Sequence, residues 1–446
     1  MIPTRLIEGP NASLEELLLR REQRAMVQKE LLERGGTLVS FTMNIPGQRK
    51  QFPLERLGFE EGTRELQRCF AGAILEERAY SGPTGEELLL RLDRPARWVK
   101  EQTVALEETH PLGRLWDMDV LDGGSLSRTA LGLPQRRCLV CGESAKVCAR
   151  SRRHSIEEVF DRAAGQLYDY FRCKESRRVG NCALRAVLWE VSVTPKPGLV
   201  DRHDSGSHAD MDFFTFVDSS AALAPWFSRF FLAGWDGAEG LFDRLRALGQ
   251  QAEAEMFDAT GGVNTHKGLI FSMSILCGAL GRAGEESFPE RPAWEAVMQA
   301  ARQLGKASLR DFAAGEGQTA GLRCYQTHGM TGIRGEAAAG FPAVFEVGLP
   351  ALRRWLDRGV SLNDGAAAAL LALIAAVDDT NMIHRGGCAE AAARKQEAAK
   401  LSAQLTEETL VPALEMLNAD YIRHHLSPGG CADLLALTLF WHLLTE

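Results

Sequence analysis

The sequence has no apolar run long enough to cross a membrane as a helix. Its most apolar stretch, residues 366–377, falls well short of the ~20 residues that a span needs. The opening residues, MIPTRLIEGPNASLEELLL, lack the charged segment and apolar core of a signal peptide. There is no excess of positive charge either, because the net charge is −8, so any phosphate site must be local. We therefore expect no membrane and no nucleic-acid partner.

The ten cysteines do not follow the pattern of a small disulfide-linked domain, which suits a reducing, cytoplasmic location. There is also no internal repeat. With 446 residues, 45% hydrophobic and 25% charged, the chain has the composition of a globular protein large enough for two or three domains.

The periodicity of the sequence changes near residue 155. Before it, residues 12–34 and 62–76 predict helices, with Asn11 or Ser13 as the first cap, and residues 37–44 and 115–121 predict strands. After it, helices are predicted near 156–171, 177–193, 209–233, 265–281, 292–314, 363–377, 388–418 and 431–444. The polar stretch 174–178 is a plausible boundary. We expect an α/β or α+β domain over residues 1–170 and a mainly all-α domain over residues 171–446.

Two acids in GRLWDMDVLD (residues 113–122) are the clearest chemical feature of the first domain. On a strand, Asp117 and Asp119 would share one face. That spacing can hold Mg²⁺ against a triphosphate, where the metal neutralises the transferring phosphoryl group and the leaving pyrophosphate. The alternative is an amphipathic strand with a solvated acidic face.

An arginine-rich region follows, with Arg136 and Arg137 and then ARSRRH (residues 149–154), which contains Arg150, Arg152 and Arg153. Guanidinium groups bind phosphate through paired donors, so these residues could hold phosphates beside a metal. A solvated basic helix start would explain them equally well.

Four potential zinc ligands occupy the same region: Cys138, Cys141, Cys148 and His154. Cys138 and Cys141 have the spacing of a zinc knuckle, but the remaining spacing is not a standard ligand pair. Buried reduced thiols are the favoured interpretation over structural zinc.

The first two motifs of the second domain contain candidate functional residues. In TPKPGLVD (residues 194–201), Pro195 and Pro197 exclude a helix interior and predict a rigid loop that presents Lys196. GSHADMD (residues 206–212) leads into a helix with Asp210 and Asp212 in its first turn, where capping explains the acids as well as metal binding does.

The segment GGVNTHKG (residues 261–268) predicts a phosphate cradle. Asn264 or Thr265 would cap the next helix, and Lys267 would lie in its first turn beside free backbone N–H groups. The segment does not match the order of a Walker motif, and a lysine that simply points into water is the alternative.

Further polar residues lie in glycine-rich segments. In DDTNMIHRGG (residues 378–387), Asp378 and Asp379 would crowd the negative end of a helix and need a cation, which could be Arg385 or Mg²⁺. THGMTGIRGE (residues 327–336) and PGGCAD (residues 428–433) also place polar residues among glycines. His328 would more often be structural than catalytic, and Asp433 could be only a first-turn acid.

Taken together, the first-domain motifs resemble a known family. SFTMNIPG (residues 40–47), GRLWDMD (113–119), SRTALGLPQRRC (127–138) and CARSRRH (148–154) are similar to apo-citrate lyase phosphoribosyl-dephospho-CoA transferase over roughly residues 10–165. The resemblance implies a nucleotidyltransferase-like domain in which a serine of the acyl-carrier (gamma) subunit attacks the α-phosphate of triphosphoribosyl-dephospho-CoA and expels pyrophosphate.

The second-domain motifs resemble triphosphoribosyl-dephospho-CoA synthase over roughly residues 175–446. The resemblance includes EV (190–191), PKPGLVD (195–201), HADMD (208–212), GVNTHKG (262–268), THG (327–329), RGE (334–336), DTN (379–381), RGG (385–387) and PGG (428–430). This family is all-α, and its activity joins ATP to 3′-dephospho-CoA with release of adenine. A fusion would make the intermediate and deliver it from one chain.

The resemblances and the residues together define the expected sites. Catalytic roles are expected for Asp117, Asp119, Asp378, Asp379 and Glu336; nucleotide binding for Lys196, Lys267, His266, Asn264, Arg334, Arg385, Arg150, Arg152 and Arg153; and Mg²⁺ binding for Asp117, Asp119, Asp210, Asp212 and Asp379. Three other functions stay open: the same chemistry for the carrier of malonate decarboxylase, a nucleotide-binding regulatory protein, and a nucleosidase that hydrolyses ATP.

Overall fold

The computed structural model describes residues 2–310 and 320–446. The chain forms two compact units, Met1–Lys174 and Glu175–Glu446, here called unit 1 and unit 2. The division falls inside one helix, α5 (Ile156–Ser192). Two helices were expected there, but the polar stretch between them consists mainly of good helix formers and continues the helix.

Unit 1 is built on a four-stranded antiparallel sheet in the order β2-β3-β1-β4. Its elements, in chain order, are α1 (Leu14–Glu33), β1 (Thr37–Met43), α2 (Pro53–Cys69), β2 (Ile74–Tyr80), β3 (Glu87–Leu92), α3 (Ala96–Thr109), β4 (Trp116–Leu121) and α4 (Ala145–Ser151). Ser13 caps α1 in a capping box with Glu16, as expected from the sequence. The antiparallel sheet makes unit 1 an α+β domain.

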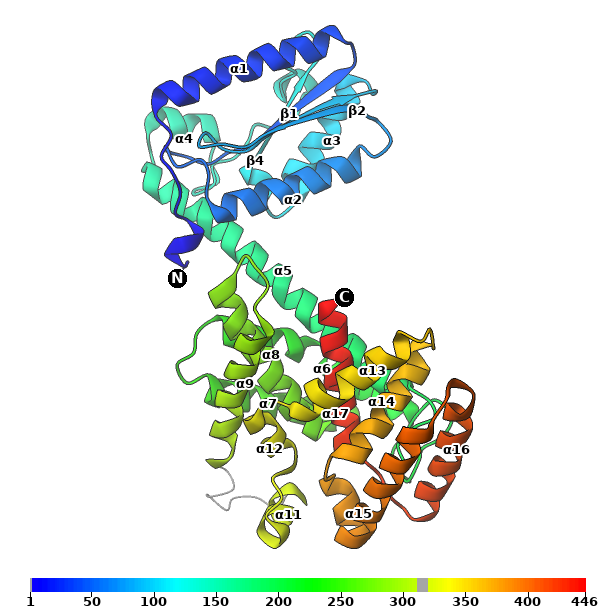
Figure 1. Ribbon diagram of the computed structural model, residues 1–446. Coiled ribbons are helices and arrows are strands. Elements are labelled where there is room, and N and C mark those ends of the chain that lie inside the picture. The colour runs from blue at the N-terminus through cyan, green and yellow to red at the C-terminus, as the bar shows by residue number, and fades with distance from the viewer. Residues whose placement is uncertain (1, 311–319) are drawn as a thin grey trace. The chain divides into compact units, whose positions relative to one another are not determined.

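Helices cover both faces of this sheet, with α1 on one side and α2 and α3 on the other (Figure 1). On the α1 side, Leu31, Leu38 and Leu89 form a buried cluster. On the other side, Phe41 stacks on Phe59 with ring centroids 4.8 Å apart. This packing fixes which face of β4 is buried.

The outer edge of β4 is covered by side chains of α3. The buried Lys100 donates to the Met118 carbonyl over 3.0 Å, and the Met118 N–H donates to the buried Glu107 carboxylate over 3.0 Å. These bonds satisfy backbone groups that an edge strand would otherwise leave unpaired. The strand that carries Asp117 and Asp119 is therefore held firmly along this edge.

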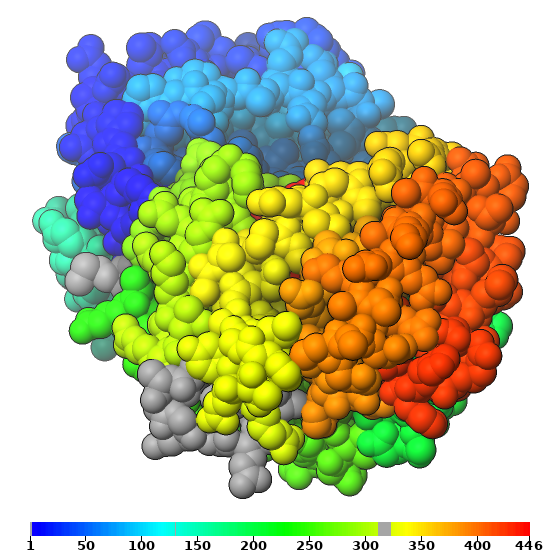
Figure 2. Space-filling model, turned by 60° about the horizontal axis from the view of Figure 1, so that its bottom comes forward, coloured from blue at the N-terminus to red at the C-terminus, as the bar shows by residue number. Residues whose placement is uncertain are grey.

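Unit 2 is helical throughout the part of it that the structure describes. After α5 come α6 (Phe213–Trp235), α7 (Leu241–Ala259), α8 (Lys267–Ser287), α9 (Trp294–Ser308), α11 (Ala320–His328), α12 (Gly332–Ala339), α13 (Leu349–Leu356), α14 (Leu362–Ala376), α15 (Thr380–Gln404), α16 (Glu407–Arg423) and α17 (Gly429–Thr445). α11 packs on α15, and α13 on α14. Figure 2 shows these yellow and orange segments side by side on one face of the surface.

Small residues let α6 and α8 pack backbone to backbone. A Cβ atom added at Gly234 would lie 2.0 Å from the Gly278 carbonyl oxygen, and one at Gly281 would lie 2.0 Å from the Phe231 carbonyl oxygen. No side chain fits at either position. The close packing fixes where the first turn of α8 lies.

Several sequence-based boundaries were wrong. The helix expected at 62–76 is α2 (Pro53–Cys69), and β2, β3 and α3 were not foreseen. The helix expected at 388–418 is two helices, α15 and α16, and α15 itself breaks at Gly387 (φ 80°). The end of the helix expected at 292–314 lies outside the described residues.

Among the residues that the structure describes, no single helix has both the length and the apolar character to cross a membrane. α14 and α15, bent by 54° where they meet, pass that test only as a pair, by length and composition.

Candidate active sites

A cavity of about 1220 Å³ lies inside unit 2. Single-ligand pockets are usually about 300–1,000 Å³, so this cavity has room for more than one nucleotide-sized molecule. Both acidic and basic side chains line it, which suits substrates that carry several phosphates.

The starts of four helices line this cavity. The first two residues of each contribute to its wall: α8 (Lys267, Gly268), α12 (Gly332, Ile333), α15 (Thr380, Asn381) and α17 (Gly429, Gly430). Helix N-termini carry partial positive charge and unpaired N–H groups, which bind anions. The cavity is therefore electropositive at its backbone before any side chain is considered.

The first turn of α8 combines three residues that the sequence singled out. The Asn264 side chain accepts from the Lys267 N–H over 3.3 Å. The N-cap residue of α8 is His266, whose side chain makes no capping bond, so the expectation of Asn264 or Thr265 at the N-cap was wrong. Lys267 Nζ forms an ion pair of 2.8 Å with Glu253 and stays partly exposed. Thr265 instead donates to Ser219 over 2.7 Å.

His266 is buried, and one of its ring nitrogens has no partner among the described residues. Its Nδ1 lies 2.6 Å from the Ser219 hydroxyl, which also accepts from Thr265. The tautomer in which Nδ1 accepts from Ser219 lets this hydroxyl both donate and accept a hydrogen bond. Nε2 then carries the proton, yet it is buried without a hydrogen bond. Burial first, and then the charge of Lys196, lowers the pKa of His266 to about 3, so the ring is neutral.

Asp379 joins the starts of two helices. One carboxylate oxygen accepts from the N–H groups of Asn381 (2.8 Å) and Met382 (3.1 Å), which caps α15, and the other accepts from Cys431 N–H (2.8 Å) in α17. Burial raises the pKa of Asp379, and these backbone donors oppose the rise. The expectation that this acid faces the negative end of a helix was wrong, because the chain turns after α14 and places it at two positive ends.

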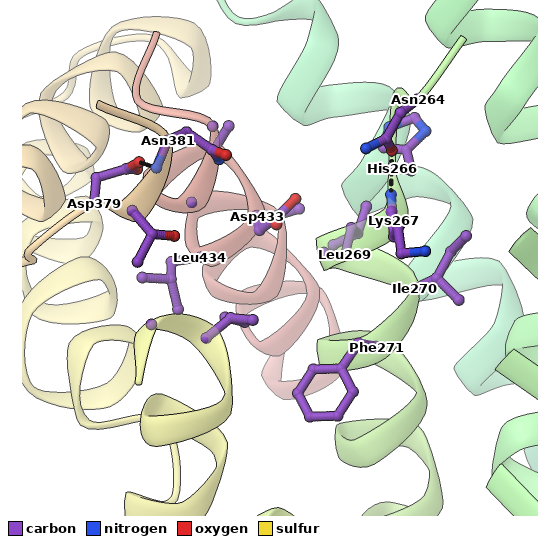
Figure 3. Close-up of a pocket in the computed structure, with 18 of the residues that line it drawn as sticks. Asn264, His266, Lys267, Leu269, Ile270, Phe271, Asp379, Asn381, Asp433 and Leu434 are labelled. Carbon is purple, nitrogen blue, oxygen red and sulfur yellow. Dashed lines mark hydrogen bonds between the residues drawn. The ribbon is translucent and has the colours of Figure 1, made fainter. Parts of the chain in front are cut away.

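Asp433 is the functional candidate that sequence reasoning undervalued. Figure 3 shows it on α17, between Asp379 and Asn381 on one side and His266 and Lys267 on the other. No described residue donates a hydrogen bond to its carboxylate. Burial first, and then the charges of Glu190 and Asp379, raises its pKa well above the usual value. The PGG segment before it was the available signal.

Gly268 permits this arrangement. A Cβ atom at Gly268 would lie 2.2 Å from Asp433 Oδ2, closer than real Cβ contacts come. A side chain at this position would therefore displace the Asp433 carboxylate from the first turn of α8.

Lys196 is not presented to solvent as the sequence suggested. The loop that carries it is held in place, since Asp201 accepts from the Lys196 N–H over 3.0 Å and Asn418 accepts from the Gly198 N–H over 2.8 Å. The Lys196 ammonium, however, is buried in an ion pair of 2.5 Å with the buried Glu190. It lines the cavity as one half of a charge pair rather than as a free cation.

Arg385 does not neutralise the acids next to it in sequence. Its guanidinium donates to the carbonyls of Ser207 (3.0 Å) and His425 (3.3 Å) and contacts His208. The exposed Asp378 pairs with Lys395 instead, over 2.7 Å.

Arg334 and Glu336 both line the cavity from α12. The Arg334 guanidinium lies 5.9 Å from the ring centre of Phe271. Glu336 accepts from the Ala343 N–H over 3.1 Å, and burial raises its pKa. His328 lies outside the cavity lining, at the end of α11.

The acids expected to bind a metal in unit 2 are not gathered at one point. Asp210 is exposed at the cavity wall, 4.0 Å from His208. Asp212 caps α6, accepting from the Thr215 N–H over 2.9 Å, and is not part of the lining. The structure gives Asp212 the capping role that the sequence analysis had left open.

In unit 1, Asp117 and Asp119 lie on the same face of β4, as alternation predicts. They stand opposite Thr42 and Ser40 of β1, while Trp116 is buried on the other face. The pKa of Asp119 is raised by loss of solvent and then by the charge of Asp117, although the side chain keeps solvent access. Two neighbouring carboxylates on one face of a strand form a suitable pair for a divalent cation.

Arg136 joins this acidic pair to the protein core. It lies 3.0 Å from Asp117 Oδ1 and also pairs with the buried Glu107, which in turn pairs with Arg128. Arg150, Arg152 and Arg153 lie in and just after α4, and all three are exposed. The arginine that contacts the acidic pair is therefore Arg136, from the first of the two arginine-rich stretches.

The three cysteines and the histidine of the same region converge. The ligand atoms of Cys138, Cys141, Cys148 and His154 all lie within 4.8 Å of one another. All ten cysteines of the chain are free thiols. The sequence had favoured buried thiols over structural zinc; of these three cysteines only Cys148 is buried, and all four residues meet.

Comparison with known proteins matches each unit to one family. Residues 176–446 match the family model described as CitG, ATP:dephospho-CoA triphosphoribosyl transferase, and residues 12–170 match CitX, apo-citrate lyase phosphoribosyl-dephospho-CoA transferase. The chain is 36% identical to the protein CitXG of Haemophilus influenzae and 34% to that of Leuconostoc mesenteroides, in each case over 97% of both chains. It is 41% identical to a probable 2-(5''-triphosphoribosyl)-3'-dephosphocoenzyme-A synthase of Vibrio cholerae, over 60% of this chain and 89% of that protein.

The chain has one unit with an acidic pair beside an arginine and one with a large polar cavity, and each unit matches a family of transferases. The chain belongs to the CitX–CitG fusion family. It is an enzyme of citrate lyase prosthetic-group synthesis, in which the two units are a triphosphoribosyl-dephospho-CoA synthase and a phosphoribosyl-dephospho-CoA transferase.

Proposed function

We propose that the cavity of unit 2 is the synthase active site, where ATP and 3′-dephospho-CoA bind together. A ribose hydroxyl of dephospho-CoA attacks C1 of the ATP ribose; the new glycosidic bond forms as the bond to adenine breaks, and the triphosphate stays intact. The observation that carries this assignment is that the starts of four helices line one cavity, with Lys267 and Arg334 also in its lining. Helix starts and cationic side chains around one cavity suit a triphosphate.

Asp433 is the proposed general base. It takes the proton of the attacking hydroxyl, because it lines the cavity and no described residue donates a hydrogen bond to its carboxylate. Asp379 is less suited, because both of its oxygens already accept backbone hydrogen bonds; its role is to position α15 and α17. Negative charge from these acids would also stabilise an oxocarbenium-like transition state, as in glycoside chemistry.

His266 is proposed to hold the substrate through the unpaired Nε2–H. A buried donor without a partner costs free energy, which a hydrogen bond to bound nucleotide would recover. The ring is neutral, so it acts as a hydrogen-bond donor and not as a charge.

For unit 1 we propose a nucleotidyltransferase-like site at Asp117 and Asp119. These carboxylates would hold Mg²⁺, which would neutralise charge on the triphosphate. Arg136 would contact the phosphates, and the exposed Arg150, Arg152 and Arg153 would extend that surface. A serine of the citrate lyase acyl-carrier (gamma) subunit attacks the α-phosphate, and pyrophosphate leaves. ATP as substrate and ten free thiols support work in the cytoplasm.

The two half-reactions give separate tests. Adenine release from ATP that requires dephospho-CoA supports the synthase, whereas release without it would indicate a nucleosidase, and no release would leave only a nucleotide-binding regulatory role. Asp433→Asn should abolish release, with Asp258→Asn as the matched control, because Asp258 is exposed on α7 and outside the cavity lining. Full activity of Asp433→Asn would remove Asp433 as the base.

A further inference from the structure

The four converging side chains in unit 1 have the composition and geometry of a metal site. Tetrahedral zinc bound through sulfur and nitrogen holds its ligand atoms about 3.5–3.8 Å apart. The ligand atoms of Cys138, Cys141, Cys148 and His154 all lie within 4.8 Å of one another, and Cys141 Sγ is 3.4 Å from Cys148 Sγ. Only small side-chain shifts separate this arrangement from a coordination shell.

The backbone around the first two cysteines forms a zinc knuckle. A short hairpin is closed by bonds from the Cys138 N–H to the Glu143 carbonyl (2.5 Å) and from the Ala145 N–H to the Arg136 carbonyl (3.0 Å). At its tip, Gly142 adopts φ +74°, a conformation that favours glycine, directly after Cys141. The tight turn brings both thiols to one side.

The other two ligands come from the helices that follow. Cys148 lies in α4, and His154 lies two residues before the start of α5. His154 Nδ1 lies 3.2 Å from the Glu158 carboxylate, while its buried Nε2 has no hydrogen-bond partner among the described residues. A histidine held by a carboxylate at one nitrogen, with the other directed at thiols, is the usual arrangement of a metal-binding histidine.

We propose that Cys138, Cys141, Cys148 and His154 bind one structural zinc ion. Three thiolates and an imidazole are a common closed zinc set, whereas iron–sulfur clusters most often take four cysteines. A Cys-x-x-Cys pair in a reducing compartment also favours metal over a disulfide.

The proposed ion would order the segment that carries the arginines. Arg136, which contacts Asp117, lies two residues before the first ligand, and Arg150, Arg152 and Arg153 lie between the last two. Zinc would therefore position the phosphate-binding surface of unit 1 without touching substrate, and its binding energy would stabilise the local fold.

The test is the metal content of the full untagged chain, grown with zinc and purified without chelator. We expect about one zinc per chain in the wild type, and loss of that zinc in Cys138→Ser and Cys148→Ser. Cys69→Ser, a unit 1 thiol outside the cluster, should keep it. Adenine release by the cysteine variants shows that unit 2 remains folded.

A second measurement does not depend on variants. Wild-type protein loaded with Co²⁺ in place of zinc should show thiolate-to-cobalt charge-transfer bands and the intense visible bands of tetrahedral cobalt. Wild-type protein without bound zinc, zinc retained in Cys138→Ser, or a cobalt spectrum without thiolate bands would each overturn the proposal.

Discussion

Replacing Gly268 by alanine tests the close approach between the first turn of α8 and Asp433. The added Cβ would lie 2.2 Å from Asp433 Oδ2, whereas real Cβ atoms essentially never come closer than 3.0 Å to another heavy atom. The Asp433 carboxylate must therefore move by roughly 1 Å, and a displacement of that size at a reacting group can cost on the order of 100-fold in rate. We expect kcat for adenine release to fall by about that factor.

The assay is adenine release from ATP in the presence of saturating dephospho-CoA. Gly284→Ala is the matched control on the same helix, because its Cβ would meet Trp235 at an ordinary 3.4 Å. Transfer of separately prepared triphosphoribosyl-dephospho-CoA to the carrier, a reaction of unit 1, should be unchanged in both variants.

A stability measurement separates the proposed cause from a general folding defect. Overpacking costs about 1–3 kcal/mol, and removing the Asp433 side chain should relieve it. The Gly268→Ala/Asp433→Ala double variant should thus be more stable than Gly268→Ala alone, while both stay inactive. Wild-type kcat in Gly268→Ala would refute the placement of Asp433 in the reaction.

Three further results are expected. Asp117→Asn should reduce transfer to the carrier at least about 100-fold, since a metal ligand is lost, and should leave adenine release unchanged. Equal loss of both activities would contradict the assignment of transfer to unit 1 and of adenine release to unit 2. His266→Ala should raise the KM for a nucleotide substrate roughly tenfold, the value of about one hydrogen bond, and an unchanged KM would show that Nε2 does not contact substrate. Glu55 is buried, and burial followed by the charge of Glu86 raises its pKa from 4.5 to about 8, so the folded state holds a proton that the unfolded state loses. Unit 1 should therefore lose up to about 1.4 kcal/mol of stability per pH unit between about pH 4.5 and 8. Glu55→Gln should remove this loss, as measured by hydrogen exchange in β1 and β4. The same pH dependence in the wild type and in Glu55→Gln would contradict this explanation.

The sequence predicted the local structure where one pattern dominates. Alternation at residues 115–121 placed Asp117 and Asp119 on one face of a strand, and helical periodicity identified the all-α second domain. The predictions failed where the pattern was weak. β2 carries three charged residues in a row among its seven and is largely exposed, so neither apolar alternation nor turn chemistry marks it.

The sites were harder to predict because they depend on distant residues. The sequence around Lys196 does not show that Glu190 pairs with it in the interior, because this ion pair forms only when the loop has folded. Asp433 looked like an ordinary first-turn acid until Gly268 was seen against its carboxylate. Likewise, the spacing of the four zinc-ligand candidates follows no standard pattern, and only the hairpin and the two helix starts bring them together.

The most direct test of the whole account is a mass spectrum of the apo acyl-carrier subunit after incubation with this protein, ATP, Mg²⁺ and dephospho-CoA. The account predicts a shift by the mass of phosphoribosyl-dephospho-CoA, lost in both Asp117→Asn and Asp433→Asn. Adding separately prepared triphosphoribosyl-dephospho-CoA should restore the shift for Asp433→Asn only. An unmodified carrier with the wild-type protein, together with no release of adenine, would contradict the account.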